Sequence, residues 1–112
     1  MAAMSTSLTE FSNNGDTRTS SLTGHAVSQP QLVIEKRKVP NGSQQVAEST
    51  VSVVVATTDV DGAVMQPKYN FTVVVRSPIG GNSTDKALAL STLRDIVAGD
   101  EFANTLDTQE WL

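Results

Sequence analysis

The chain has 112 residues, no cysteine and a net charge of −4. This length is too short for a multidomain enzyme, and any core must form without disulfide bonds. A charged fraction of only 18% argues against a disordered tail. Because a small core with few aromatic residues gains little from burial, we expect another subunit to complete the domain.

Charge is distributed unevenly along the chain. Residues 31–82 carry five basic side chains against four acidic ones, whereas residues 83–112 carry six acidic side chains against two basic ones. The bases are therefore concentrated in the middle and the acids at the end. No stretch approaches the ~20 apolar residues of a membrane span, and no export signal is visible, so we expect no membrane partner.

Turn residues divide the first half of the chain into short strands. Residues 13–16 (NNGD) have turn chemistry, and residues 28–30 (SQP) interrupt the chain before a run of β-branched and long side chains. That run, residues 31–39, ends at Pro40-Asn41-Gly42, where Asn-Gly favours the positive φ values of a tight turn. We expect strands on both sides of each break.

Two valine-rich arms, residues 48–58 and 65–77, should complete an antiparallel meander. Because successive strand residues point to opposite faces, their alternation predicts one apolar face and one polar face. The apolar set is Val51, Val53, Val55, Tyr69, Phe71, Val73 and Val75, and the polar set is Thr50, Ser52, Lys68, Asn70, Thr72 and Arg76. The alternation leaves the faces of residues 31–39 open.

The hydrophobic period becomes helical after residue 82. Ser83-Thr84-Asp85 offers an N-cap with an acid in the first turn, and apolar residues then recur at helical spacing until Gly99. This stripe consists of Leu90, Leu93, Ile96 and Val97. A second helical segment, from Asp100 to about Leu112, offers Phe102, Leu106 and Trp111. Strands followed by helices predict an α+β fold, with the helices covering one sheet face.

Few residues are suited to catalysis or metal binding. His25 is the only histidine, no acid lies within three residues of it, and cysteine is absent, so we expect no enzyme, cofactor or metal site. Asp59 and Asp61 lack the full pattern of a calcium loop and are interpreted as turn residues. Residues 80–84 lack the lysine of a phosphate-binding loop and are interpreted as a connector.

The densest basic run, residues 35–38 (EKRK), has two interpretations. It could be a solvated edge strand whose charges prevent pairing with other sheets. Alternatively, it could contact nucleic-acid phosphates beside polar groups that bind sugars or base edges. The candidate residues are Lys36, Arg37, Lys38, Thr50, Ser52, Lys68, Asn70, Thr72 and Arg76. Both interpretations remain open at this point.

The order of elements at the C-terminal end matches a known pattern. In KYNFTVVVRSPIGGNSTDKALALSTLRDIVAGDEFANTLDTQEWL, a final strand leads through a polar connector at residues 78–82 to an STD helix start and two helices. This arrangement resembles the C-terminal region of the coat proteins of single-stranded RNA bacteriophages, the leviviruses. The segment LVIEKRKVP is similar to the family's basic middle strands. The resemblance covers residues 31–112 loosely and 67–112 better.

The resemblance implies one coat-protein domain, residues 1–112, with a β-sheet region at 1–82 and a helical dimerisation region at 83–112. One sheet face would look into an icosahedral shell, where Lys36, Lys38, Lys68, Asn70, Thr72 and Arg76 face the genome, Thr50 and Ser52 contact bases, and Arg37 is ambiguous. The helices would clasp a dimer partner through Leu90, Leu93, Ile96, Val97, Phe102 and Leu106.

The implied partners are a second copy of the chain and single-stranded viral RNA, including an RNA hairpin as one option, with no small-molecule substrate. The implied location is the virion, assembled in the cytoplasm of a bacterial host. The main alternative is a cellular β-rich module, such as a fimbrial subunit, that binds no nucleic acid. Such subunits need export and usually a disulfide, so the sequence favours the capsid protein.

Overall fold

The computed structural model describes residues 4–40 and 46–112 of the chain. In these ranges the strands are β1 (Thr9–Asn14), β2 (Thr17–Ser21), β3 (Gln31–Lys38), β4 (Val46–Val55) and β5 (Tyr69–Pro78), and the helices are α1 (Ser83–Ala98) and α2 (Asp100–Thr108). All strands precede both helices, which confirms the predicted α+β class. Neither helix is long and apolar enough to cross a membrane.

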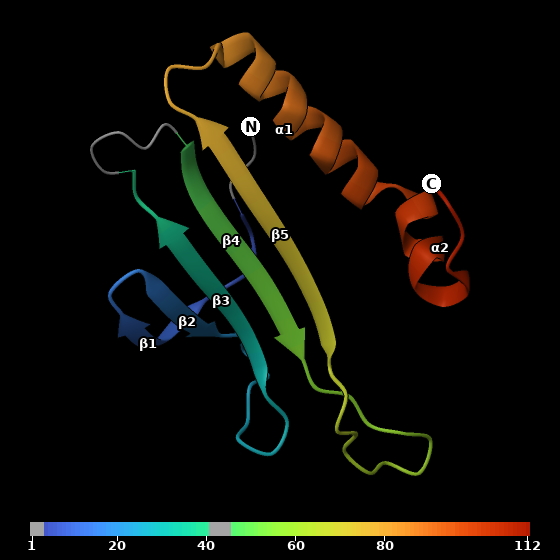
Figure 1. The fold of residues 1–112 in the computed structure, drawn as a ribbon. Coiled ribbons are helices and arrows are strands. Elements are labelled where there is room, and N and C mark those ends of the chain that lie inside the picture. Colours follow the sequence, from blue (N-terminus) through green and yellow to red (C-terminus); the bar gives the residue numbers. More distant parts are fainter. Residues whose placement is uncertain (1–3, 41–45) are drawn as a thin grey trace. The chain divides into compact units, whose positions relative to one another are not determined.

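The chain forms two compact units, Met1–Ile79 with the sheet and Gly80–Leu112 with the helices. The division falls within the polar connector predicted between the last strand and the first helix. In the first unit, the strands pair in the order β1-β2-β3-β4-β5, and every pair is antiparallel. The predicted meander is therefore confirmed (Figure 1). The turn expected at Asn41-Gly42 lies outside the described residues.

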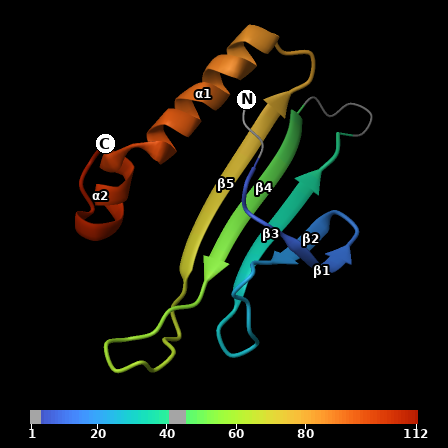
Figure 2. The ribbon, with the colours of Figure 1, turned by 180° about the vertical axis from the view of Figure 1, so that it is seen from behind.

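β1 and β2 form a short hairpin beside the three long strands (Figure 2). Its two-residue turn is Gly15-Asp16, as the turn chemistry predicted, and Gly15 adopts a φ of +64°, which glycine tolerates without steric cost. The register shifts between Glu10 and Ser12, so Phe11 is an extra residue on β1. This β-bulge changes the direction in which the Phe11 side chain points.

The β4–β5 connection is longer than the sequence predicted. β4 ends at Val55 and β5 begins at Tyr69, with one isolated bridge between Thr58 and Val64. Beyond this bridge, the Asp59 carboxylate accepts hydrogen bonds from the backbone N–H groups of Asp61 at 2.9 Å and Ala63 at 3.0 Å. The Asp59 side chain thus accepts hydrogen bonds in place of a backbone carbonyl of a paired strand, so strand pairing does not continue past the bridge. The turn interpretation of this segment is confirmed.

The helix boundaries differ from the predictions at two places. α1 begins at Ser83, but the capping side chain belongs to Asn82, whose Oδ1 accepts a hydrogen bond from the Thr84 N–H at 2.8 Å. α2 ends at Thr108 and not near Leu112, because Gln109 takes the left-handed conformation, with a φ of 56°. Gly99 separates the two helices as expected.

The described part of the chain contains almost no buried core. Only Val33, at 8% exposure, and Ser20, at 3%, are buried, and neither helix contains a buried residue. A single-layer sheet can shield its apolar face only with another layer. The expectation that helices cover this face stays a prediction.

Candidate nucleic-acid interface

Strand register divides the side chains of the sheet between two faces, because directly paired residues point to the same side. We call one the hydroxyl face: Thr17, Thr19, Ser21, Leu32, Ile34, Lys36, Lys38, Glu48, Thr50, Ser52, Val54, Asn70, Thr72, Val74 and Arg76. We call the other the valine face: Glu10, Arg18, Ser20, Val33, Glu35, Arg37, Ser49, Val51, Val53, Val55, Tyr69, Phe71, Val73 and Val75. This division agrees with the alternation predicted for β4 and β5.

The register also assigns the faces of β3, which the sequence left open. Lys36 pairs with Thr50, and Lys38 pairs with Glu48, so both lysines belong to the hydroxyl face. Arg37 pairs with Ser49 and therefore lies on the valine face. The three consecutive bases do not form one strip, and Arg37 is separated from the other candidate residues by the sheet itself.

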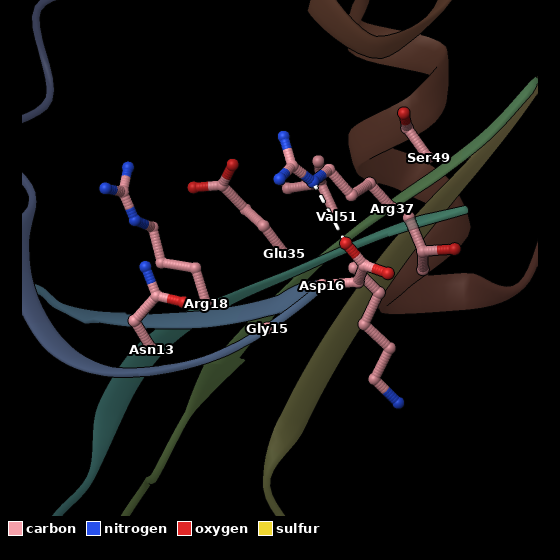
Figure 3. A pocket seen from close by; sticks show the side chains of 10 residues that line it. Asn13, Gly15, Asp16, Arg18, Glu35, Arg37, Ser49 and Val51 are labelled. Carbon is pink, nitrogen blue, oxygen red and sulfur yellow. Dashed lines mark hydrogen bonds and ion pairs between the residues drawn. The ribbon is translucent and has the colours of Figure 1, made fainter. Parts of the chain in front are cut away.

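Arg37 contacts the turn between β1 and β2. Its Nε lies 3.3 Å from Oδ1 of Asp16, and its backbone N–H donates to the Asp16 carbonyl at 2.9 Å. Figure 3 shows this pair in a pocket that Arg18 and Glu35 also line. These two contacts, one from the backbone and one from an exposed side chain, link the hairpin turn to β3.

Three of the candidate residues are brought together at the centre of the hydroxyl face. The Ser52 and Thr72 hydroxyl oxygens are 3.1 Å apart, and the Thr72 hydroxyl donates to Oδ1 of Asn70 at 3.0 Å. All three side chains remain accessible to solvent. This short hydrogen-bonded chain presents hydroxyl and amide groups to any molecule that lies on the face.

Arg76 has a partner that the sequence did not reveal. Glu48 lies opposite it in the β4–β5 register, with 3.7 Å between Arg76 Nε and Glu48 Oε2. Glu48 also lies opposite Lys38 on the other side. The acid therefore sits between two of the candidate bases. Only the register could have shown this, because Glu48 is distant in sequence from both.

The structure places the remaining candidates less uniformly. Lys68 directly precedes β5, so no strand pairing assigns it to a face. Conversely, Thr17, Thr19 and Ser21 extend the hydroxyl face onto β2, although the sequence interpretation did not include them. The alternation within TRTSS was the signal that could have identified these three residues.

The two faces differ in the sign of their charge. The hydroxyl face carries Lys36, Lys38 and Arg76 against the single acid Glu48. The valine face carries Arg18 and Arg37 against Glu10, Glu35 and the neighbouring Asp16, and Arg18 pairs with Glu10 at 3.4 Å. A phosphate backbone is therefore attracted to the hydroxyl face more strongly than to the valine face.

The predicted helical stripe is accessible. Leu90, Leu93 and Ile96 keep 37–38% of their surface exposed, and Val97 keeps 47%. On α2, Leu106 is 53% exposed and Phe102 is partly buried. In the described residues, no group of three or more histidine or acidic side chains is arranged to hold a metal ion.

The chain shares its fold with several solved virus-like particles. A chain of the Wenzhou levi-like virus 4 particle is 18% identical, with a TM-score of 0.73 over 96% of this chain and 79% of that one. A chain of the Beihai levi-like virus 32 particle is 13% identical, with a TM-score of 0.75 over 98% of this chain and 91% of that one. A chain of the Beihai levi-like virus 21 particle is 8% identical, with a TM-score of 0.77 over 94% of this chain and 86% of that one.

No family model matches the sequence, and no curated protein matches it either. The likeness is therefore carried by three-dimensional structure and not by sequence identity. A five-stranded antiparallel sheet followed by two helices is the fold of the levi-like and bacteriophage particles to which this chain is similar, and the resemblance to levivirus coat proteins is confirmed at the level of the fold.

Proposed function

We propose that this protein is the coat protein of a levi-like virus, which dimerises, assembles into a closed shell and packages single-stranded RNA. The observation that carries the proposal is the extent of the structural likeness. Three chains from virus-like particles match 94–98% of this chain, with TM-scores of 0.73–0.77. A likeness of that extent includes nearly all of this chain and not merely a common hairpin.

Exposed apolar surface supports the assembly part of the proposal. Phe71 and Val73 on the valine face keep 36% and 38% of their surface exposed, and the stripe on α1 is exposed to a similar degree. Apolar patches that remain open in one chain are typical of surfaces buried between subunits. We infer that the stripe of Leu90, Leu93, Ile96 and Val97, together with Phe102 and Leu106, forms the dimer interface.

The hydroxyl face supports the RNA part of the proposal. Its positive charge favours binding to phosphates, and its exposed hydroxyl and amide groups can bind base edges and 2′-hydroxyls of unpaired nucleotides. The residues proposed to contact RNA are Lys36, Lys38, Thr50, Ser52, Asn70, Thr72 and Arg76 on this face, together with Lys68, which directly precedes β5. Arg37 is not among them. The protein then acts as a structural component of the virion, assembled in the bacterial cytoplasm, without catalytic activity.

Electron microscopy of the purified protein tests the assembly. We expect uniform closed particles that contain nuclease-protected RNA. Fibres would favour the fimbrial alternative, and a monodisperse monomer at high protein concentration would contradict both. Dissociation of the particles, followed by analytical ultracentrifugation, should yield dimers as the smallest folded species.

The salt dependence of RNA affinity tests the binding surface. For single strands, log affinity falls by roughly 0.7 per log unit of salt for each phosphate neutralised. Lys68→Ala and Arg76→Ala should reduce this slope, with the smaller effect for Arg76 because Glu48 already pairs with it. Lys86→Ala and Arg94→Ala on α1 are the matched controls and should leave the slope unchanged. Equal effects from both pairs would contradict the proposed surface.

A further inference from the structure

The loop between β2 and β3 is closed by hydrogen bonds, one of which uses the only histidine of the chain. The Leu22 N–H donates to the Gln31 carbonyl at 2.9 Å, and the His25 N–H donates to the Leu22 carbonyl at 3.0 Å. In the opposite direction, the Gln31 N–H donates to Nδ1 of the His25 side chain at 3.1 Å. The backbone bond between Leu22 and Gln31 joins the two ends of the loop, and the imidazole ties residue 25, inside the loop, to the first residue of β3.

The same imidazole also contacts β1. The rings of Phe11 and His25 lie edge to face, with centroids 5.4 Å apart and an angle of 71° between their planes. Phe11 is the extra residue of the β1 bulge, and the bulge accounts for its departure from the regular alternation of the strand. His25 therefore connects two segments, the edge strand β1 and the β2–β3 loop.

The hydrogen bond from Gln31 requires one protonation state of the imidazole. Nδ1 can accept a hydrogen bond only when it carries no proton, so the neutral ring must hold its proton on Nε2. When the ring is protonated, both nitrogens become donors, and Nδ1 then faces another donor, the Gln31 N–H. Protonation therefore removes the acceptor and opposes closure of the loop.

We propose that His25 is a pH-sensitive latch, which holds the β2–β3 loop closed against Phe11 at neutral pH and releases it when the imidazole is protonated. Histidine is the side chain whose charge ordinarily changes between pH 5 and 8. The latch requires only the folded sheet unit, so its test does not depend on whether the protein is a coat protein.

The charged groups around the latch do not offer a replacement for the lost bond. Residues 22–30 contain no other titratable side chain. On the adjoining elements, Glu10 of β1 pairs with Arg18 of β2, and Glu35 lies four residues beyond Gln31 on β3. Pro30 accepts a hydrogen bond from the Ala56 N–H, which leads to the loop with Asp59 and Asp61. Among the described residues, none of these acids forms an ion pair with His25.

Hydrogen–deuterium exchange followed by mass spectrometry tests the latch on the full-length protein in its native assembly state. The protection of residues 22–31, corrected for the intrinsic effect of pH on exchange, is compared at about pH 7.5 and about pH 5. We expect protection to fall by roughly threefold to tenfold in acid, the range given by the loss of one hydrogen bond. Residues 49–55 of β4, which are paired on both sides and contain no titratable side chain, should show no such change.

His25→Asn provides the matched variant, because its side-chain oxygen can still accept the bond but does not titrate. Its loop protection should be the same at both pH values, and His25→Gln serves if that variant does not fold. Loop protection that is independent of pH in the unmodified protein would overturn the proposal. An equal fall in the Asn variant would also overturn it, because the change would then arise from another group.

Discussion

The two faces of the sheet are built from the same strands and yet have opposite surface chemistry. On β5, Phe71 and Val73 belong to an apolar surface that is negatively charged near the β1–β2 hairpin, whereas Thr72 and Arg76 belong to a positively charged surface with hydroxyl and amide groups. Because the side-chain period of a strand is two, neighbouring residues serve different surfaces. In the proposed function, the sheet would therefore separate subunit contacts from RNA contacts within a single layer.

Substitution of the neighbouring Val73 and Val74 should have the largest effects and tests the separation of the two faces. Val73 lies on the valine face with 38% of its surface exposed, and Val74 lies on the hydroxyl face with 44% exposed. Val73→Asp should abolish particle formation, because a charge buried in a subunit interface costs several kcal/mol. Val74→Asp should leave particles intact and weaken RNA binding by adding a negative charge. Electron microscopy and RNA content measure both outcomes.

The two valines are well matched, since they share residue type, strand and nearly the same exposure. Loss of particles in both variants would show that β5 simply does not tolerate aspartate. Normal particles from Val73→Asp would show that the valine face is not an assembly interface.

A substitution in the helical stripe should have an effect of similar magnitude. Leu93→Asp should abolish the dimer, at a cost on the order of the whole stability of a small domain. Leu88 is the control: it is 65% exposed and, five residues earlier, lies about 140° around the helix from Leu93. Protein that carries Leu88→Asp should still sediment as a dimer. A cooperatively folding monomer of Leu93→Asp would disprove the obligate dimer.

A smaller effect is expected at the acid of the hydroxyl face. Glu48→Gln removes the charge that pairs with Arg76 and faces Lys38 across the strands. RNA affinity at low salt should rise by roughly twofold to fivefold, because an exposed ion pair is worth less than about 1 kcal/mol. Thermal stability should barely change. Glu35→Gln on the valine face is the control, and an equal rise there would indicate a general charge effect.

Much of the fold could be predicted from the sequence, because its signals are local. The turn at Gly15, the alternation in residues 69–76 and the helical stripe that ends before Gly99 were sufficient to give the meander and the first helix. The incorrect predictions concern the ends of the helices. Asn82 provides the N-cap of α1 in place of Ser83, and the left-handed Gln109 ends α2 before Leu112. These ends depend on single dihedral angles and side-chain hydrogen bonds, to which hydrophobic periodicity is insensitive.

The site was harder to predict because it depends on register. Apolar and charged residues alternate without a consistent pattern in β3, so the face of Arg37 could be assigned only from its pairing with Ser49. The Glu48–Arg76 ion pair likewise joins residues 28 positions apart. The hydroxyls of β4 and β5 could be assigned because most of their neighbours alternate between apolar and polar residues, with Val54 and Val74 as exceptions.

The salt dependence of RNA affinity for Lys36→Ala and Arg37→Ala tests the division of faces most directly. The two residues are consecutive, exposed and equally charged, but the register places them on opposite faces. Lys36→Ala should reduce the slope of log affinity against log salt by roughly 0.7, the contribution of one phosphate contact to a single strand. Arg37→Ala should leave the slope unchanged in protein that remains folded by circular dichroism. Equal reductions in both variants, or a larger one for Arg37→Ala, would contradict the assignment of RNA binding to the hydroxyl face.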